Sequence, residues 1–385
     1  MSSIHNIQVL PAASPGNAIT SIDTPALLLD ADAFERNLDV MQARADAAGV
    51  ALRPHAKAHK CPAIALAQIQ RGAVGICCQK VSEALPFLHA GVTDIHISNE
   101  VIGSAKLDLL ARMALHGRFS VCVDHPDQVM ALAAATAEHG SRIDVFVEIN
   151  VGQNRCGVAD ARQVLQLLEV MSAHAQLTFK GLQAYQGGIQ HIRDHGERRD
   201  ASGLAAARTG EVVDALSRAG VACAVVTGGG SGSVEFDLAS GVYTEVQPGS
   251  YAFMDGDYGR NVYTDALRFE HSLFLATSVI SVGNSDAGQV VVVDAGLKSL
   301  AVDSGLPTVW GDGGASTTLH YTVVNDEHGS VQMLNRDVAK PALGSQLLLV
   351  PGHCDPTLNL HDEIIVFRGE RVEIIWPVSA RGHSR

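Results

Sequence analysis

The sequence predicts a (β/α)₈ TIM barrel followed by a separate C-terminal all-β domain, and three observations support this fold class. The first part of the 385-residue chain alternates short apolar runs with helical stretches, most of which end at a glycine. Eight such runs occur over roughly 200 residues, and their continuous apolar character is typical of strands buried on both faces. Farther along, β-branched runs alternate with turn signals instead. An open doubly wound sheet is the alternative to the barrel.

The first regular elements precede the predicted barrel. Residues 24–30 (TPALLLD) predict a short strand that could pair with the β domain, and Asp32 is expected to cap the helix that follows. Gly49 stands where a left-handed C-terminal cap belongs. One buried helix face is expected from apolar residues that recur at steps of four and three, namely Phe34, Leu38, Met41, Ala45 and Ala48.

The remaining strands follow from the same reading of apolar runs. The eight barrel strands are expected near residues 50–54, 74–78, 94–98, 119–123, 144–149, 177–185, 222–227 and 242–247. The later strands are expected near residues 272–282, 290–293, 319–324, 347–350, 364–368 and 372–376. The predicted domains are therefore an N-terminal segment (1–30) whose strand joins the β domain, the barrel (31–264) and the β domain (265–385).

Charge and composition limit the classes of partner. A formal net charge of −13 argues against nucleic acid and anionic membranes, because both attract basic surfaces. No apolar run reaches the roughly 20 residues of a membrane span, and no signal segment is evident. The seven cysteines form no CxxC pair and are expected to be reduced. We therefore expect a soluble, cytoplasmic protein with a small-molecule partner.

Two glycine-rich segments follow the seventh and eighth predicted strands. They are TGGGSGS at residues 227–233, which includes Gly230, Ser231 and Gly232, and Gly249-Ser250. In (β/α)₈ barrels the loops at these two positions commonly bind phosphate, since glycine lets backbone N–H groups approach an anion. The alternative is a pair of tight turns. Their occurrence at both expected positions favours a phosphorylated ligand.

The first predicted barrel strand leads into RPHAKAHK at residues 53–60. This segment places basic groups at the C-terminal mouth of the barrel, where active sites of this fold lie. Lys57 is the lysine closest to the strand end. A lysine desolvated among other cations has a lowered pKa and can form a Schiff base with an aldehyde. The alternative is an ordinary solvated lysine.

A third cluster lies in PGHCDPTLNLHD at residues 351–362. If the chain is extended there, His353 and Asp355 share one side and can bind one divalent ion, while Cys354 points away. Such a pair leaves open positions for a substrate. The alternative is a loop whose polar side chains are satisfied within the protein.

These segments together resemble the D-threonine aldolase family, pyridoxal-phosphate enzymes with an alanine-racemase-like barrel. Beside RPHAKAHK, the motifs are GICCQKVSEA (75–84), GGGSGSVEFD (228–237), GSYAFMDGDYG (249–259), DAGLKS (294–299), and GHCDPT with NLHD (352–362). The resemblance implies a cofactor aldimine on Lys57 and a Mn²⁺, Mg²⁺ or Co²⁺ site at His353 and Asp355. It implies cofactor contacts at Gln79, Arg155, Tyr185, Gly230, Ser231, Gly232, Gly249, Ser250 and Tyr258.

The same resemblance implies cleavage of D-3-hydroxy amino acids of the D-threonine or D-allo-threonine type to glycine and an aldehyde, by a homodimer. The base for the 3-hydroxyl is expected to be His191 or a metal-bound hydroxide, with His59 as a third candidate. Two positions depart from the pattern: Gln186 stands where some members have histidine, and Ser231 where relatives often have threonine.

Three other functions are open at this stage. A 3-hydroxy-D-aspartate aldolase would need a cation for a second carboxylate, which Arg155 or Arg260 could supply. A D-serine or D-3-hydroxyaspartate dehydratase shares the fold, but its metal pair resembles a histidine with a cysteine two residues later, where this chain has Asp355. The third function is a non-catalytic carrier of pyridoxal phosphate. Such carriers lack the β domain, so residues 265–385 of this chain argue against that function.

Overall fold

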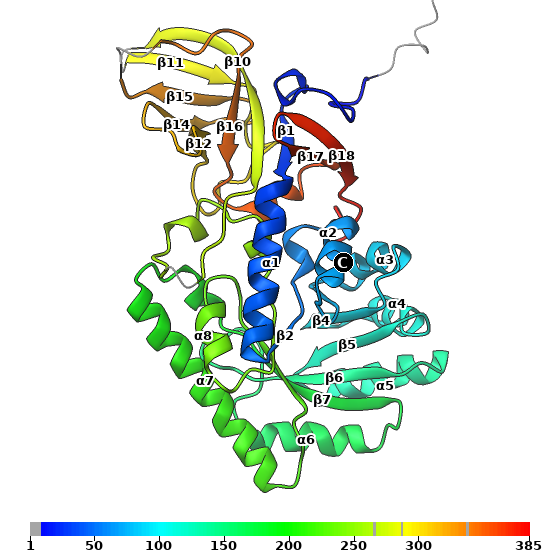
Figure 1. Ribbon diagram of the computed structural model, residues 1–385. Helices are drawn as coiled ribbons and strands as arrows, with labels where there is room; N and C mark the ends of the chain where they lie inside the picture. Colours follow the sequence, from blue (N-terminus) through cyan, green and yellow to red (C-terminus); the bar gives the residue numbers. More distant parts are fainter. Residues whose placement is uncertain (1–8, 265–266, 286–287, 336–338) are drawn as a thin grey trace, which may run out of the picture. The chain divides into compact units, whose positions relative to one another are not determined.

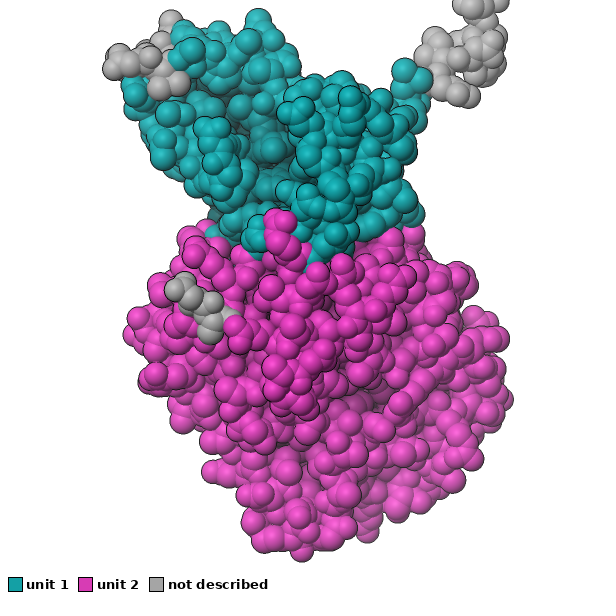
Figure 2. All heavy atoms as spheres, viewed as in Figure 1, with its two compact units in different colours: residues 1–35, 253–256, 270–378 teal, residues 36–252, 257–269, 379–385 magenta. Residues whose placement is uncertain are grey.

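The computed structural model describes residues 9–264, 267–285, 288–335 and 339–385, so residues 1–8 of the predicted N-terminal segment and the predicted boundary at residue 265 lie outside it. The chain divides into two compact units (Figure 2). The first, here called the β unit, comprises Met1–Glu35, Phe253–Gly256 and Glu270–Val378. The second, the barrel unit, comprises Arg36–Ala252, Asp257–Phe269 and Ser379–Arg385.

Parallel strands form a closed sheet in the barrel unit, in the order β2-β9-β8-β7-β6-β5-β4-β3 (Figure 1). A parallel bridge between His55 and Cys77 joins the two ends of this order. Hydrogen bonds from Cys77 N to Pro54 O (2.8 Å) and from Val74 N to Leu52 O (2.9 Å) complete the closure. The predicted eight-stranded barrel is confirmed, and each predicted run overlaps one strand.

The first and last barrel strands, β2 and β9, have only two residues each. The barrel strands are β2 (Ala51–Leu52), β3 (Ile76–Cys78), β4 (Asp94–Glu100), β5 (Arg118–Val123), β6 (Ile143–Glu148), β7 (Leu177–Ala184), β8 (Val225–Gly228) and β9 (Glu245–Val246). The helices are α1 (Ala31–Ala48), α2 (Pro62–Gln70), α3 (Val81–His89), α4 (Ser104–Met113), α5 (Pro126–His139), α6 (Ala161–Ser172), α7 (His195–Arg218) and α8 (Val234–Ala239). One helix follows each of the strands β2 to β8, as a (β/α)₈ fold requires.

Helix α1 differs from its prediction at its start. Asp32 is not the cap: the carboxylate of Asp30 accepts hydrogen bonds from Asp32 N (2.9 Å) and Ala33 N (3.2 Å). The reason is that the helix follows the strand β1 without an intervening loop, so the last strand residue takes the cap position. Gly49 has the expected positive φ of 67°. The predicted apolar face is buried except at Ala48, which is exposed in the last turn.

The β unit is built on a sheet of order β13-β12-β16-β10-β1-β17-β18, with β11, β15 and β14 continuing from β10. Strand β1 runs antiparallel to β10 and parallel to β17. The strands are β1 (Ala26–Asp30), β10 (Leu273–Ser285), β11 (Gly288–Val293), β12 (Thr308–Gly311), β13 (Gly314–Ala315), β14 (Leu319–Val324), β15 (Gly329–Met333), β16 (Gln346–Val350), β17 (Glu363–Arg368) and β18 (Arg371–Pro377). A short helix, α9, spans Cys354–Leu358.

The core of this sheet includes Leu28, Phe274, Val350 and Ile365, all nearly inaccessible to solvent. The predicted β domain is confirmed, and every strand predicted after residue 265 is present. Strands β12, β13 and β15 and helix α9 were not predicted. Among the described residues, no helix has both the length and the apolar character needed to cross a membrane.

Candidate active site

A cavity of about 260 Å³ lies at the C-terminal ends of the barrel strands, within the barrel unit. Eight of the residues predicted from sequence line it: Lys57, Gln79, Arg155, Tyr185, Gly230, Ser231, Gly249 and Tyr258. Gly229, within the predicted phosphate-binding segment 227–233, also lines it, and four further lining residues were not predicted: His55, Ser98, Gln183 and Gln247. Gly232, Ser250 and His191 are outside the lining set, although each is a chain neighbour or contact of a residue in it.

Lys57 reaches this cavity from a 3₁₀ turn, η3 (Ala56–Ala58), that follows strand β2. The imidazole of His55 caps the turn by accepting from Lys57 N at 3.4 Å, and its Nε2 lies 2.9 Å from Ser98 Oγ. Since Nδ1 accepts, Nε2 carries the proton and donates to Ser98. The turn that presents Lys57 is thus fixed from two sides.

The other cations of this segment have ion-pair partners. Arg53 Nε lies 2.9 Å from Glu245 and its Nη1 lies 2.6 Å from Asp94, while Lys60 Nζ lies 2.9 Å from the buried Glu83. Lys57 is exposed, so the predicted desolvation among other cations is not found, and its distinguishing feature is its position at the cavity.

His59, the third candidate for the base that accepts the hydroxyl proton, is fully buried and does not line the cavity. Its Nδ1 accepts from Cys61 N at 3.1 Å, and its ring meets Phe87 edge-on at 6.0 Å. These contacts are those of a packed core histidine.

The two glycine-rich loops meet the cavity where only glycine fits. A Cβ on Gly230 would lie 2.6 Å from Gln190 Oε1, and one on Gly249 would lie 2.8 Å from His55 O. Ser231 accepts from Tyr251 N at 2.9 Å, which links the two loops and leaves the hydroxyl proton of Ser231 for donation. Two closely packed glycine loops on the cavity wall, a Ser231 hydroxyl that can donate, and Lys57 on the same cavity fit a phosphorylated aldehyde such as pyridoxal phosphate.

A polar network underlies the cavity. Gln183 and Gln247 line it and bond each other, with Gln247 Nε2 2.9 Å from Gln183 Oε1. Gln183 Oε1 also lies 3.3 Å from Nε2 of the fully buried His96, whose Nδ1 meets Ser120 Oγ at 2.8 Å. Burial lowers the pKa of His96 to about 3. The network therefore presents neutral hydrogen-bonding groups near neutral pH.

Arg155 and Tyr185 come from the loops after strands β6 and β7. The guanidinium carbon of Arg155 lies 5.5 Å from the centre of the Tyr185 ring, a cation–π distance. Arg155 Nη2 also lies 3.8 Å from Glu148, whose pKa is raised to about 8 by burial and by the nearby Glu100. The two predicted pocket residues are thus brought together on one side of the cavity.

His191 lies on the 3₁₀ turn η4 (Gly187–His191), with its ring centre 5.6 Å from that of Tyr258. Its Nδ1 bonds the buried carboxylate of Asp257, which also pairs with Arg193 and, at 2.7 Å, with Arg260. Burial alone would raise the pKa of Asp257, but Arg193 and His191 outweigh it and lower that pKa. In a neutral His191, an ionised Asp257 holds the single proton on Nδ1, so Nε2 is the acceptor.

The predicted metal pair lies in the β unit, at the start of helix α9 rather than in extended chain. His353 is the N-cap residue and Asp355 stands in the first turn, with His353 Nε2 4.0 Å from Asp355 Oδ1. The expected extended backbone is therefore found at His353 but not at Cys354 and Asp355, which begin the helix, and the turn still gathers the two side chains. Cys354 is buried, and its N donates to Asp255 at 3.0 Å.

The electrostatics of this pair fit a divalent cation. Asp303 Oδ2 lies 2.7 Å from His353 Nδ1 and so fixes Nε2 as the ligand atom. Burial disfavours the charged form of His353, but Asp355 and Asp303 outweigh burial and raise the pKa of His353. An imidazole nitrogen beside a carboxylate is a donor set for Mn²⁺ and related ions.

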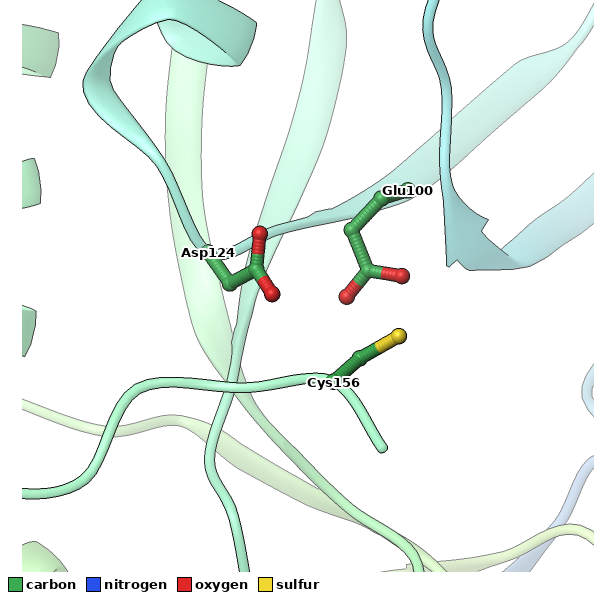
Figure 3. Close-up of side chains that lie close together, drawn as sticks. All are labelled: Glu100, Asp124 and Cys156. Carbon is green, nitrogen blue, oxygen red and sulfur yellow. The ribbon is translucent and has the colours of Figure 1, made fainter. Parts of the chain in front are cut away.

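A second group of possible ligands lies in the barrel unit. Glu100, Asp124 and Cys156 point toward one another from the ends of strands β4 and β5 and the loop after β6 (Figure 3), with ligand atoms within 4.8 Å of one another. Burial raises the pKa of Cys156 to about 11, so the thiol is protonated near neutral pH. Two carboxylates and one protonated thiol do not by themselves define a metal site.

Known proteins match both units of this chain. Residues 29–257 match the family model of the alanine racemase N-terminal domain, and residues 272–367 match that of a putative serine dehydratase domain. A D-threonine aldolase from an Arthrobacter species is 51% identical over 382 residues, or 99% of each chain. A 3-hydroxy-D-aspartate aldolase from Paracoccus denitrificans (strain Pd 1222) is 44% identical over 380 residues, 96% of this chain and 95% of that one.

Among solved structures, the D-threonine aldolase from Filomicrobium marinum superposes with a TM-score of 0.93, at 46% identity, over 97% of this chain and 100% of that chain. The chain therefore belongs to the alanine racemase N-terminal domain family. Within that family it is similar along its whole length to D-threonine aldolases, and the family predicted from the sequence motifs is confirmed.

Proposed function

We propose that the protein is a pyridoxal-phosphate- and divalent-metal-dependent aldolase that cleaves D-3-hydroxy amino acids of the D-threonine type to glycine and an aldehyde. The observation that carries this proposal is the cavity that combines Lys57 with a glycine cradle, in a chain similar over its full length to D-threonine aldolases. Cytoplasmic location and a homodimer remain predictions from the sequence.

The residues of the cavity divide the binding work. Lys57 would hold the aldehyde carbon of the cofactor, and Gly230, Ser231 and Gly249 would receive its phosphate. When bound, pyridoxal phosphate supplies an electron sink for the electron pair left at Cα. The cation–π contact of Arg155 with Tyr185 fixes the guanidinium and the ring, so both can orient a bound ligand.

His353 and Asp355 would hold the divalent ion, which when bound supplies a Lewis acid that acidifies a hydroxyl group. The hydroxyl proton would go to Nε2 of a neutral His191, because the bond to Asp257 places the single proton of a neutral imidazole on Nδ1. Asp355 stands where the resembling dehydratases have cysteine, and this supports cleavage of the carbon skeleton over loss of the hydroxyl.

One of the two candidate cations for a second substrate carboxylate has an internal anionic partner. Arg260 pairs with Asp257 at 2.7 Å. This supports D-threonine over 3-hydroxy-D-aspartate as the preferred substrate, because a committed guanidinium binds a further carboxylate less well.

The variant Asp355→Ala tests the proposal. We expect it to keep the cofactor absorbance of the wild type, because the barrel unit holds the lysine and the glycine cradle, and to lose more than about a hundredfold of aldol cleavage. Absorbance spectra and a glycine assay with added Mn²⁺ measure the two properties. If metal-free Asp355→Ala cleaved the substrate at the wild-type rate, the assigned role of the metal would be wrong.

A further inference from the structure

Gln190 lies beneath the glycine-rich loop that follows strand β8. It is 1% exposed and sits on the turn η4, outside the cavity lining. Both ends of its carboxamide bond the loop: Oε1 accepts from Gly232 N at 2.9 Å, and Nε2 donates to Ser233 Oγ at 2.8 Å. The Ser233 hydroxyl in turn donates to the buried Asp237 at 2.6 Å. Gln190 thus connects the loop to the turn after β7 and, through Ser233, to helix α8.

The loop backbone also lies directly on Gln190. A Cβ on Gly232 would lie 2.4 Å from the carbonyl oxygen of Gln190, and one on Gly230 would lie 2.6 Å from its Oε1. Such approach is possible only for glycine. The loop main chain therefore packs against the main chain of Gln190 at Gly232 and against its side chain at Gly230, and the loop cannot move toward Gln190.

These bonds determine which loop groups face the cavity. The N–H of Gly232 is engaged by Gln190, and the N–H of Gly230 is engaged by Ser233 Oγ at 3.2 Å. Gly230 and Ser231 themselves line the cavity, and the hydroxyl of Ser231 keeps its proton for donation. Without Gln190, the buried N–H of Gly232 would lose its acceptor and Ser233 Oγ would lose one of its donors, so the loop would rearrange to satisfy the Gly232 N–H.

We propose that Gln190 is a positioning residue that holds the loop 229–233 in the shape that receives the phosphate of the cofactor. This rests on the proposed function, because it takes the phosphorylated ligand from it. Gln190 acts through the loop backbone and contacts the loop rather than the ligand.

The test compares pyridoxal phosphate with pyridoxal, which has the same aldehyde and no phosphate. The full-length apoprotein is titrated with each, and binding is followed by absorbance. Gln190→Ala should bind pyridoxal phosphate about ten- to a hundredfold more weakly, with pyridoxal affinity changed by less than about twofold. Gln190→Glu keeps the side-chain shape but loses the donor to Ser233 and adds a negative charge, so the same selective loss is expected if Gln190→Ala fails to fold.

Gln186→Ala is the matched control. Gln186 caps the same turn, with its Oε1 accepting from Gly188 N at 2.8 Å, and no bond from its side chain to the glycine-rich loop is found among the described residues. It should bind both ligands as the wild type does. The inference is overturned if a Gln190 variant binds pyridoxal phosphate at wild-type affinity, or loses both ligands by the same factor. A wild-type protein that binds no pyridoxal phosphate would instead refute the proposed function, and the inference with it.

Discussion

At the scale of single residues, His96 links barrel stability to pH. It is fully buried between Ser120 and Gln183, and burial lowers its pKa from 6.5 to about 3. A histidine with a lowered folded-state pKa contributes stability above pH 6.5 and loses it as the pH falls toward 3, because the unfolded chain takes up the proton first. The wild-type free energy of unfolding should therefore fall by up to about 1.4 kcal/mol per pH unit through this one group.

The variant His96→Gln isolates this effect, because glutamine stays neutral throughout the range. Its unfolding free energy should be lower than that of the wild type at pH 7, with a shallower decline on acidification. Urea unfolding at several values between pH 6.5 and pH 4.5 measures the difference. Parallel pH profiles for the two proteins would mean that His96 is not held neutral.

Asp303 belongs to the same scale. It bonds Nδ1 of His353 at 2.7 Å and so orients the imidazole whose Nε2 is the proposed ligand atom. Partners of this kind typically raise metal affinity or activity by about ten- to a hundredfold. Asp303→Ala should weaken Mn²⁺ binding by about this factor in a calorimetric titration, with less effect than Asp355→Ala. Equal Mn²⁺ affinity in Asp303→Ala and wild type would contradict the orienting role.

Lys57 could be found from sequence because it follows a strand end and belongs to a recognisable motif. His55, Gln183 and Gln247 line the same cavity and were missed. Each sits at or just beyond the end of a barrel strand, a position that could have signalled them. What the sequence does not contain is the pairing of the two glutamines, which lie far apart in the chain and meet only after the barrel closes.

At the scale of elements, replacing glycine by alanine should have different effects at two positions. It should stabilise a helix at Gly203 and weaken cofactor binding at Gly232. Gly203 lies exposed within α7, where nothing is within 4 Å of an added Cβ, so Gly203→Ala should stabilise the helix by about 1 kcal/mol. Gly232→Ala would place its Cβ 2.4 Å from Gln190 O and should weaken pyridoxal-phosphate binding. Thermal unfolding and cofactor titration of both variants measure the contrast. Wild-type cofactor affinity in Gly232→Ala would contradict the tight loop.

Elements with strong periodic or apolar patterns could be predicted, and weak ones could not. All eight barrel strands read as apolar runs because both faces are buried. Strand β15 buries only two apolar side chains, Val331 and Met333, and α9 is a five-residue helix, so both are too short to produce a distinct pattern in the sequence. His353 itself is extended, but the extended backbone expected onward to Asp355 was wrong for this reason: one helical turn leaves no periodicity to detect.

At the scale of the whole molecule, each unit contributes one part of the proposed chemistry. The barrel unit carries Lys57 and the glycine cradle, and the β unit carries His353 and Asp355. Similarity to D-threonine aldolases extends through both units, so those proteins have counterparts of both the barrel unit and the β unit. The net charge of −13 fits a small-molecule substrate rather than a nucleic acid.

One measurement tests the aldolase most directly: the products formed from D-threonine, D-allo-threonine and the D-3-hydroxyaspartates, with pyridoxal phosphate and Mn²⁺, before and after treatment with a chelator. We expect glycine and an aldehyde in equal amounts, formed faster from D-threonine than from the hydroxyaspartates, and no product after treatment with the chelator. Release of ammonia and a keto acid in place of glycine, or cleavage that continues undiminished in chelator, would contradict the proposed function.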